Sequence, residues 1–108
     1  MNGSNSLITT QRLETDVEGK DEYSADILSS TEAYIEPLNA QAAKNYAEYD
    51  MNMLYFMVCD GVVDVLISDR VTDDEDVTYK VIGVQSFKGG EIPSHTEVVM
   101  FKKRPIPR

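Results

Sequence analysis

The residues whose chemistry could support catalysis are few, and they form no recognisable catalytic motif. His95 is the single histidine, and Ser94 and Glu97 are the nearest candidates for a nucleophile and an orienting acid. A catalytic triad needs such groups to meet in space, and neither neighbour lies in a nucleophile motif. Cys59 is the single cysteine, and its apolar neighbours favour a buried, unreactive thiol. We therefore expect no enzymatic activity, and we expect His95 to be structural or solvent-facing.

The strongest candidate for a cation site is a run of four acids, Asp73, Asp74, Glu75 and Asp76. Hard cations prefer clustered oxygen ligands. However, the run lacks the ligand spacing and pivot glycine of a calcium-binding loop, and adjacent carboxylates repel one another. We therefore expect a solvated acidic loop. The sequence also lacks a phosphate-binding loop, a dinucleotide fingerprint and zinc-ligand spacing, so we expect no cofactor and no metal.

The charge of the chain is unevenly distributed. The net charge is −9, and all 19 acidic residues lie within residues 1–97, whereas four of the ten Lys and Arg residues lie within 102–108. An acidic body disfavours ordinary nucleic-acid binding, because phosphate contacts need a basic face. Two interpretations remain open: the acids provide solubility, or they form a surface past which DNA slides without sticking.

The length and hydropathy of the chain predict one soluble domain without a membrane segment. A chain of 108 residues is long enough for a single modest core. No apolar run approaches the ~20 residues that a membrane helix needs. The first residues also lack the basic and apolar regions of a signal peptide.

Period-two patterns predict an all-β domain over residues 7–102, either a small β-barrel or a compact β-sandwich. Asp60-Gly61 is typical of a hairpin turn, and Gly83 indicates a bulge or bend. We expect loops at residues 16–23, 68–76 and 88–94. The expected strands cover residues 7–15, 25–30, 33–38, 51–59, 62–67, 78–87 and 96–102.

One helix is expected, over residues 40–48, because Asn39 is a suitable N-cap and the segment that follows is rich in alanine. Residues 1–6 are expected to form a flexible N-terminus. Residues 103–108 (KRPIPR) are basic and contain two prolines, which cannot continue a helix or a central strand. We expect this segment to be an extended C-terminal arm.

The order of these segments resembles that of the head closure proteins of siphophages, also called head–tail joining, stopper or head completion proteins. Those proteins begin with a strand that carries an arginine and continue through a glycine-containing loop to a strand of the form A-x-[VI]-E-P-L. An Ala/Gln/Glu-rich segment, a strand, a D-R-V turn, a strand ending in Y-x-V-x-G-V and a last strand follow. The matching segments here are residues 8–12 (ITTQR), 16–23, 33–38 (AYIEPL), 51–59, 69–71 (DRV), 79–84 (YKVIGV) and 97–102.

The resemblance implies a structural virion protein of a tailed bacteriophage. Such a protein forms a homo-oligomeric ring, for instance a dodecamer, at the head–tail interface (the neck). The ring closes the portal channel, retains packaged DNA and provides the attachment site for the tail. The implied partners are other copies of the chain, the portal or adaptor protein above, and the tail terminator or tail tube protein below. DNA passes through without specific binding, and the subunit stays in the host cytoplasm until assembly.

Residue roles follow from the same resemblance. The segment after the E-P-L strand reaches into the channel in that family, and residues 39–50 match it by position. Its small and polar side chains suit a lining role, although a helix that packs Ala42 and Tyr46 onto the barrel is compatible with the same pattern. The basic arm could dock on an acidic patch of a neighbouring subunit or could remain free. The candidate lining residues are Asn39, Gln41, Lys44, Asn45 and Glu48, and the candidate docking residues are Lys102, Lys103, Arg104 and Arg108.

Two other classes of function compete with the connector. One is a small acidic β-barrel binding module, such as a phage regulator or a host-protein inhibitor that mimics DNA. It would form a one-to-one complex with a basic host protein and would be absent from virions. The other is an enzyme, which no constellation of residues supports.

Overall fold

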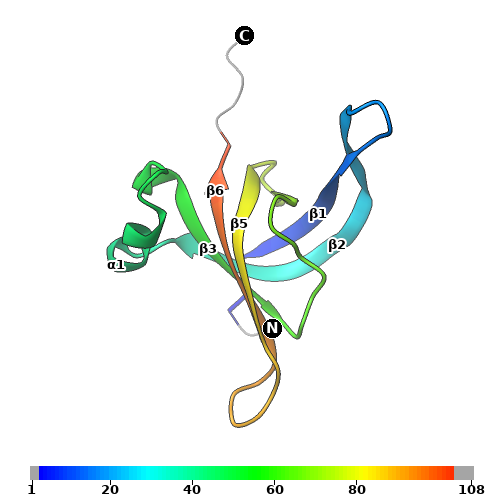
Figure 1. Cartoon of the computed structure of the whole chain (residues 1–108). Coiled ribbons are helices and arrows are strands. Elements are labelled where there is room, and N and C mark those ends of the chain that lie inside the picture. Colours follow the sequence, from blue (N-terminus) through cyan, green and yellow to red (C-terminus); the bar gives the residue numbers. More distant parts are fainter. Residues whose placement is uncertain (1–2, 104–108) are drawn as a thin grey trace.

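Six antiparallel strands form a closed barrel in the computed structural model, which describes residues 3–103 (Figure 1). The order around the barrel is β1-β2-β3-β6-β5-β4. The predicted all-β fold with one short helix is therefore confirmed, and the barrel is the architecture adopted. The strands are β1 (Ser6–Thr15), β2 (Asp21–Pro37), β3 (Leu54–Asp60), β4 (Arg70–Thr72), β5 (Thr78–Phe87) and β6 (His95–Lys102).

The core follows from strict alternation along the strands. In β6, Thr96, Val98 and Met100 are fully buried, whereas the residues between them face outward. Burying each large apolar side chain contributes about 1.5–3 kcal/mol. The buried cluster draws on all six strands and on the loop after β3, and it contains Ile8, Ala33, Met57, Cys59, Val65, Val71, Tyr79, Val81, Val98 and Met100.

The predicted strands at residues 25–30 and 33–38 are wrong as separate elements, because β2 runs unbroken from Asp21 to Pro37. β1 pairs with β2 from Ser6 to Thr15, and the two strands continue beyond the barrel as a ribbon (Figure 1). Ser30 adopts a φ of 46°, so the strand bends there without ending. The predicted loop at residues 16–23 shrinks to residues 16–20, where Gly19 has a φ of 82°.

The predicted hairpin at Asp60-Gly61 and the predicted strand at residues 62–67 are also wrong. β3 pairs with β2 on one side and with β6 on the other, so neither edge is available to residues 62–67. These residues form an irregular loop that places Val65 in the core. Buried Thr96 fixes the loop, since its hydroxyl donates to the Gly61 carbonyl (2.9 Å) and accepts from the Val63 amide (3.1 Å).

The predicted helix begins where expected but ends early. Asn39 Oδ1 accepts the Ala42 amide (2.8 Å), which confirms the N-cap. The α-helix α1 covers only Ala40–Ala43, and two 3-10 turns, η1 (Lys44–Tyr46) and η2 (Met51–Met53), lie between it and β3. The predicted strand at residues 51–59 therefore begins at Leu54 instead of Met51.

The remaining boundaries differ by little. β5 covers the predicted residues 78–87, and its register shifts between Val81 and Gly83, which confirms the bulge. The short strand β4 was not expected, because residues 68–76 are polar. Asn5 bonds both to the amide (2.9 Å) and to the carbonyl (2.8 Å) of Ile35, and Ser6 begins β1. Ordered structure thus reaches into the predicted flexible N-terminus.

Candidate functional site

An ion pair joins two of the segments that carry the resemblance. Arg12 of β1 reaches buried Asp69, with Nε to Oδ1 at 3.1 Å and Nη2 to Oδ2 at 3.1 Å. Its Nη2 also lies 2.9 Å from Asp64 Oδ1. Hydrogen bonds to Asp69 and then to Asp64 raise the pKa of Arg12 above its ordinary value. Asp69 Oδ2 further accepts the Leu66 amide (2.9 Å). The pair therefore holds the loop after β3 against β1.

A second cationic cluster surrounds Tyr23 near the base of the ribbon. The Arg70 guanidinium lies 3.9 Å from the centre of the Tyr23 ring, and its Nε donates to Gln11 Oε1 (2.9 Å). Lys103 Nζ lies 5.7 Å from the same ring centre and 3.3 Å from the Tyr23 hydroxyl. The sequence offered no signal for this cluster, because its members are far apart in the chain, with Tyr23 and Lys103 separated by 80 positions.

The segment between β2 and β3, residues 39–53, packs on the outside of the barrel beside β3 (Figure 1). Ala43 is buried, and the Tyr49 ring stacks on Phe101 of β6 with ring centres 5.0 Å apart. Tyr46 lies over Gly83, where an added Cβ would come within 2.8 Å of the tyrosine hydroxyl. The missing side chain at Gly83 therefore lets this segment rest on β5.

All five candidate lining residues lie on the exposed side of this segment, which leaves Ala43 and Tyr46 to pack inward. The Asn39 side chain is used by the helix cap. Lys44 borders an apolar hollow beside Met51, whereas Asn45 borders a different hollow beside Phe56. The segment therefore packs inward through Ala43 and Tyr46, whereas Ala42, which was expected to pack, is only half-buried. The channel-lining role stays a prediction. The exposed residues are Asn39, Gln41, Lys44, Asn45 and Glu48.

A groove lies between the 39–53 segment and the outer faces of β3, β5 and β6. It consists of two adjoining hollows, of about 360 and 270 Å³, which share Tyr46, Phe56, Glu97 and Val99. We call it the outer groove. No pattern in the sequence indicates it, because its lining comes from segments that are distant along the chain. The other residues that border it are Glu36, Leu38, Asn39, Ala42, Asn45, Ile67, Gly83, Val84 and Gln85.

Two carboxylates border the apolar floor of the outer groove. Glu36 Oε2 accepts the Tyr34 hydroxyl (3.1 Å), and this bond raises the pKa of Tyr34. Glu97 Oε2 lies 2.9 Å from Nε2 of His95. The floor between these acids is made by Phe56 and Val99, which are register partners on β3 and β6. An apolar floor with acidic borders suits a ligand that is both basic and apolar.

The predicted acidic loop is a structured turn. Asp73 Oδ1 accepts the amides of Glu75 (2.9 Å) and Val77 (3.0 Å), and its Oδ2 accepts the Tyr79 hydroxyl (3.2 Å). Asp74 Oδ1 accepts the Leu7 amide (3.3 Å). Asp74, Glu75 and Asp76 are exposed, as predicted. Within residues 3–103, no group of three or more His, Cys, Asp or Glu side chains converges to hold a metal.

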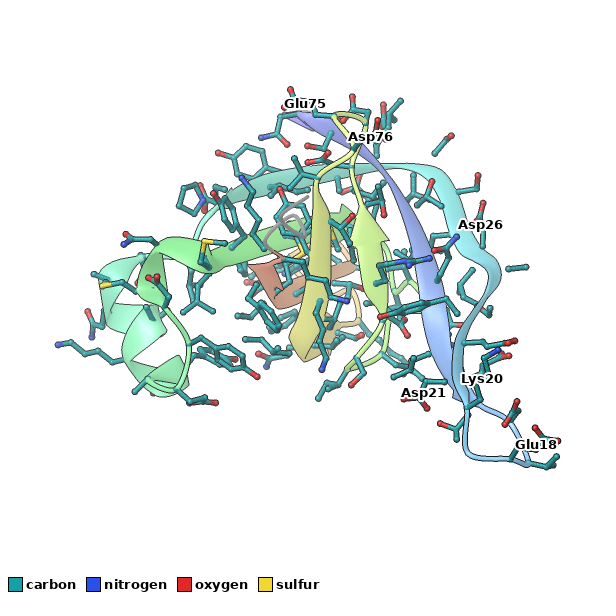
Figure 2. All side chains as sticks on the ribbon, turned by 90° about the horizontal axis from the view of Figure 1, so that it is seen from above. Glu18, Lys20, Asp21, Asp26, Glu75 and Asp76 are labelled. Carbon is teal, nitrogen blue, oxygen red and sulfur yellow. The ribbon has the colours of Figure 1, made fainter. Side chains whose placement is uncertain are left out.

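Acidic side chains also follow the β1–β2 ribbon. Figure 2 shows Glu18, Lys20 and Asp21 at its tip and Asp26 further along β2, whereas Glu75 and Asp76 lie on another part of the surface. The negative charge is therefore spread over separate parts of the molecule.

His95 and Cys59 both make defined contacts within the barrel. The His95 ring stacks on Phe87 with ring centres 4.6 Å apart, and its Nδ1 lies 2.9 Å from the Pro93 carbonyl. That bond, and then the bond with Glu97, raise the pKa of His95. Burial raises the pKa of the Cys59 thiol to about 11, which keeps it protonated at neutral pH.

The basic arm begins in a defined place. Lys102 ends β6, and the Lys103 amide donates to the Thr78 carbonyl (2.9 Å). Lys103 therefore continues the pairing of β6 with β5, and its side chain reaches the Tyr23 hydroxyl on β2. The candidate docking residues Arg104 and Arg108 lie outside the described residues.

The comparisons with known proteins support the fold. The sequence matches no protein-family model and no curated protein. The structure is similar to the solution structure of protein SF1141 from Shigella flexneri 2a, with a TM-score of 0.65 and 18% sequence identity. The match covers 94% of this chain and 96% of that one. Among the described residues, no helix is long and apolar enough to span a membrane. The chain therefore shares its whole fold with SF1141.

Proposed function

We propose that this chain is a structural subunit of a tailed-phage neck, which assembles as a ring at the head–tail interface, retains packaged DNA and receives the tail. The observation that carries the proposal is the 39–53 segment. The resemblance assigns residues 39–50 of this segment to the channel, and in the structure the segment stands outside a closed barrel with its five candidate lining side chains exposed.

The internal contacts of the barrel support the same proposal. Arg12 and Asp69 belong to two motifs of the resemblance that are far apart in sequence, and they form one bidentate ion pair. The two motifs therefore act together in this fold, because one supplies the arginine and the other the aspartate of the same ion pair. This shared contact is a reason for both motifs to occur in one chain.

The acidic surface fits a neck subunit through electrostatics. A surface with excess negative charge repels the phosphate backbone, so DNA can pass without being retained by contacts to the protein. Exposed apolar side chains remain available for subunit contacts, among them Met51, Val62, Leu66 and Ile67.

The test is electron microscopy of particles assembled after deletion of the gene that encodes this chain. We expect tailless capsids that have lost DNA, together with intact free tails, and full rescue when the wild-type gene is supplied in trans. Complete virions from the deletion strain would overturn the proposal and favour the acidic binding module.

A variant pair tests the lining segment separately. Gln41→Lys with Asn45→Lys adds two positive charges to the segment proposed to face DNA. We expect these particles to assemble but to eject DNA more slowly, because the new charges attract phosphate. Ser29→Lys with Ser86→Lys adds the same charge at exposed strand positions and is the matched control. Equal ejection rates for both variants would remove the lining role.

A further inference from the structure

The outer groove has a regular spacing of acidic and apolar groups. Glu36 pairs in register with Phe56, Phe56 with Val99, and Glu97 with Val58. With neighbouring strands about 5 Å apart and residues about 3.3 Å apart along a strand, Glu36 and Glu97 lie about 12 Å apart along the backbone. Phe56 and Val99 lie between them. The groove therefore presents acid, apolar floor and acid in sequence.

Residues 103–108 carry the complementary order of groups. The sequence Lys-Arg-Pro-Ile-Pro-Arg has no acid, and it places Ile106 between two prolines with Arg104 and Arg108 on either side. Prolines favour the polyproline II conformation, which advances about 3.1 Å per residue, and in that conformation Arg104 and Arg108 would lie about 12 Å apart. Grooves lined by aromatic side chains recognise such segments, and Tyr46 and Phe56 supply aromatic rings here.

The distance along β6 separates the start of this segment from the groove of its own copy. Lys103 is held by its amide to Thr78 and by its Nζ to the Tyr23 hydroxyl. Lys103 continues the pairing of β6 with β5, and Glu97 of the groove lies six residues before it, about 20 Å back along the strand. The groove is therefore open to the same segment from another copy.

We propose that the outer groove of one copy binds residues 104–108 of a second copy, with Ile106 on Phe56 and Val99 and with the two arginines paired to Glu36 and Glu97. Because the groove and the segment are different surfaces, the contact is heterologous and can propagate into a ring or a chain. The proposal rests on the groove and the segment alone, and it holds for any function that uses self-association.

The first experiment uses paramagnetic relaxation in the full chain. Pro107→Cys receives a spin label, since the native thiol of Cys59 is buried and stays protonated. The spin-labelled protein, at natural isotope abundance, is mixed with ¹⁵N-labelled wild-type protein that carries no spin label. The mixture is measured at millimolar concentration and low salt. We expect broadening of the Phe56 and Val99 amide signals, weakened by added salt because the ion pairs are screened. Absence of broadening at these amides would overturn the proposal.

The second experiment separates contact between copies from contact within one copy. Glu36→Lys with Glu97→Lys disables the groove, and Arg104→Glu with Arg108→Glu disables the segment. We expect each variant alone to self-associate at least about tenfold more weakly than wild type in sedimentation velocity, and a mixture of the two to form a one-to-one complex. The complex should form because the groove variant keeps an intact 104–108 segment and the segment variant keeps an intact outer groove.

The controls keep the result specific. Glu18→Lys with Glu22→Lys makes the same charge change on the exposed ribbon and should leave self-association as in wild type. If the mixture shows no complex, the segment does not bridge two copies and the proposal fails. Because these measurements use purified protein, their failure is distinct from a failure of the neck function, which is tested in particles.

Discussion

At the scale of single residues, a few polar side chains hold the loops that close the barrel. Arg12, Asp69 and Thr96 each bond to more than one part of the chain. Asp69 and Thr96 are almost completely buried, so each depends on these partners to offset the cost of leaving water. Within residues 3–103, no buried side-chain nitrogen or oxygen lacks a hydrogen-bond partner.

Replacement of Arg12 tests the ion pair. Arg12→Ala leaves Asp69 buried without its cation, and we expect a loss of roughly 3 kcal/mol in the free energy of unfolding. This lies at the lower end of the range for buried pairs, because about a quarter of the Arg12 side chain is exposed. The measurement is equilibrium unfolding in urea. Arg70→Ala is the control: it removes a cation that bonds a neutral amide, and it should cost less. Equal losses of unfolding free energy in the two variants would contradict the conclusion that buried Asp69 depends on the charge of Arg12.

Titration of His95 tests the contacts of this ring with Pro93 and Glu97, where β5 and β6 are joined. We expect a pKa above 6.5 by NMR, because the Pro93 carbonyl and then Glu97 stabilise the protonated ring. A raised pKa means that the folded state binds the proton more tightly than the unfolded chain does. The stabilisation is therefore fully present below about pH 6.5 and is lost as the pH rises through the folded-state pKa.

The variant Glu97→Gln isolates one part of this effect. It keeps the side-chain shape but removes the negative charge, so the His95 pKa should fall while the bond to Pro93 remains. An unchanged pKa in this variant would show that Glu97 does not act on the ring.

At the scale of elements, the close approach of Tyr46 to β5 positions the 39–53 segment. Because Gly83 has no side chain, the Tyr46 hydroxyl occupies the space that a Cβ would take. The glycine is needed here for space and not for its backbone angles, since its φ is not positive. Together with buried Ala43 and the Tyr49–Phe101 stack, this contact keeps the segment on the barrel beside the outer groove.

Gly83→Ala should displace Tyr46 and destabilise the protein by about 1 kcal/mol, since a methyl group is forced into a filled site. The measurement combines thermal unfolding with NMR shifts of residues 39–49. Adding Tyr46→Phe to Gly83→Ala removes the clashing oxygen and should restore both readouts, whereas Tyr46→Phe alone should change little. A double variant as unstable as Gly83→Ala would mean that the contact is not the cause.

At the scale of the whole molecule, neighbouring strands of the barrel differ in how many residue pairs join them. We call each such pairing a seam. β3 pairs with β6 over seven residue pairs, whereas β1 pairs with β4 over three. A seam with few hydrogen bonds opens at lower cost than the rest of the sheet. The weak seam also borders the ribbon, which extends beyond the barrel (Figure 1).

Amide hydrogen exchange should follow this difference. We expect the amides that pair β1 with β4, around Thr10 and Val71, to exchange faster than those that pair β3 with β6, around Met57 and Val98. Both seams are buried at these residues, so exposure in the folded state does not explain a difference. Equal protection would show that the barrel opens only as one unit, which would contradict the prediction.

The sequence alone was sufficient wherever a local rule decides the structure. Alternation located β5 at residues 78–87, the asparagine cap located the start of α1, and the glycine indicated the bulge at Gly83. The exposure of the candidate lining residues and of most of the acidic loop also followed from polarity and local spacing. Each of these features depends on residues that are neighbours in the chain.

Only the tertiary structure decided features that depend on which strands meet. β3 pairs with β6, so residues 62–67 had no available edge and became a loop despite their β-branched composition. β4 is a strand because β1 and β5 lie on either side of it, and the polar residues of this region conceal it in the sequence. The Arg12–Asp69 pair and the outer groove join residues more than 50 positions apart, and no local pattern encodes such contacts.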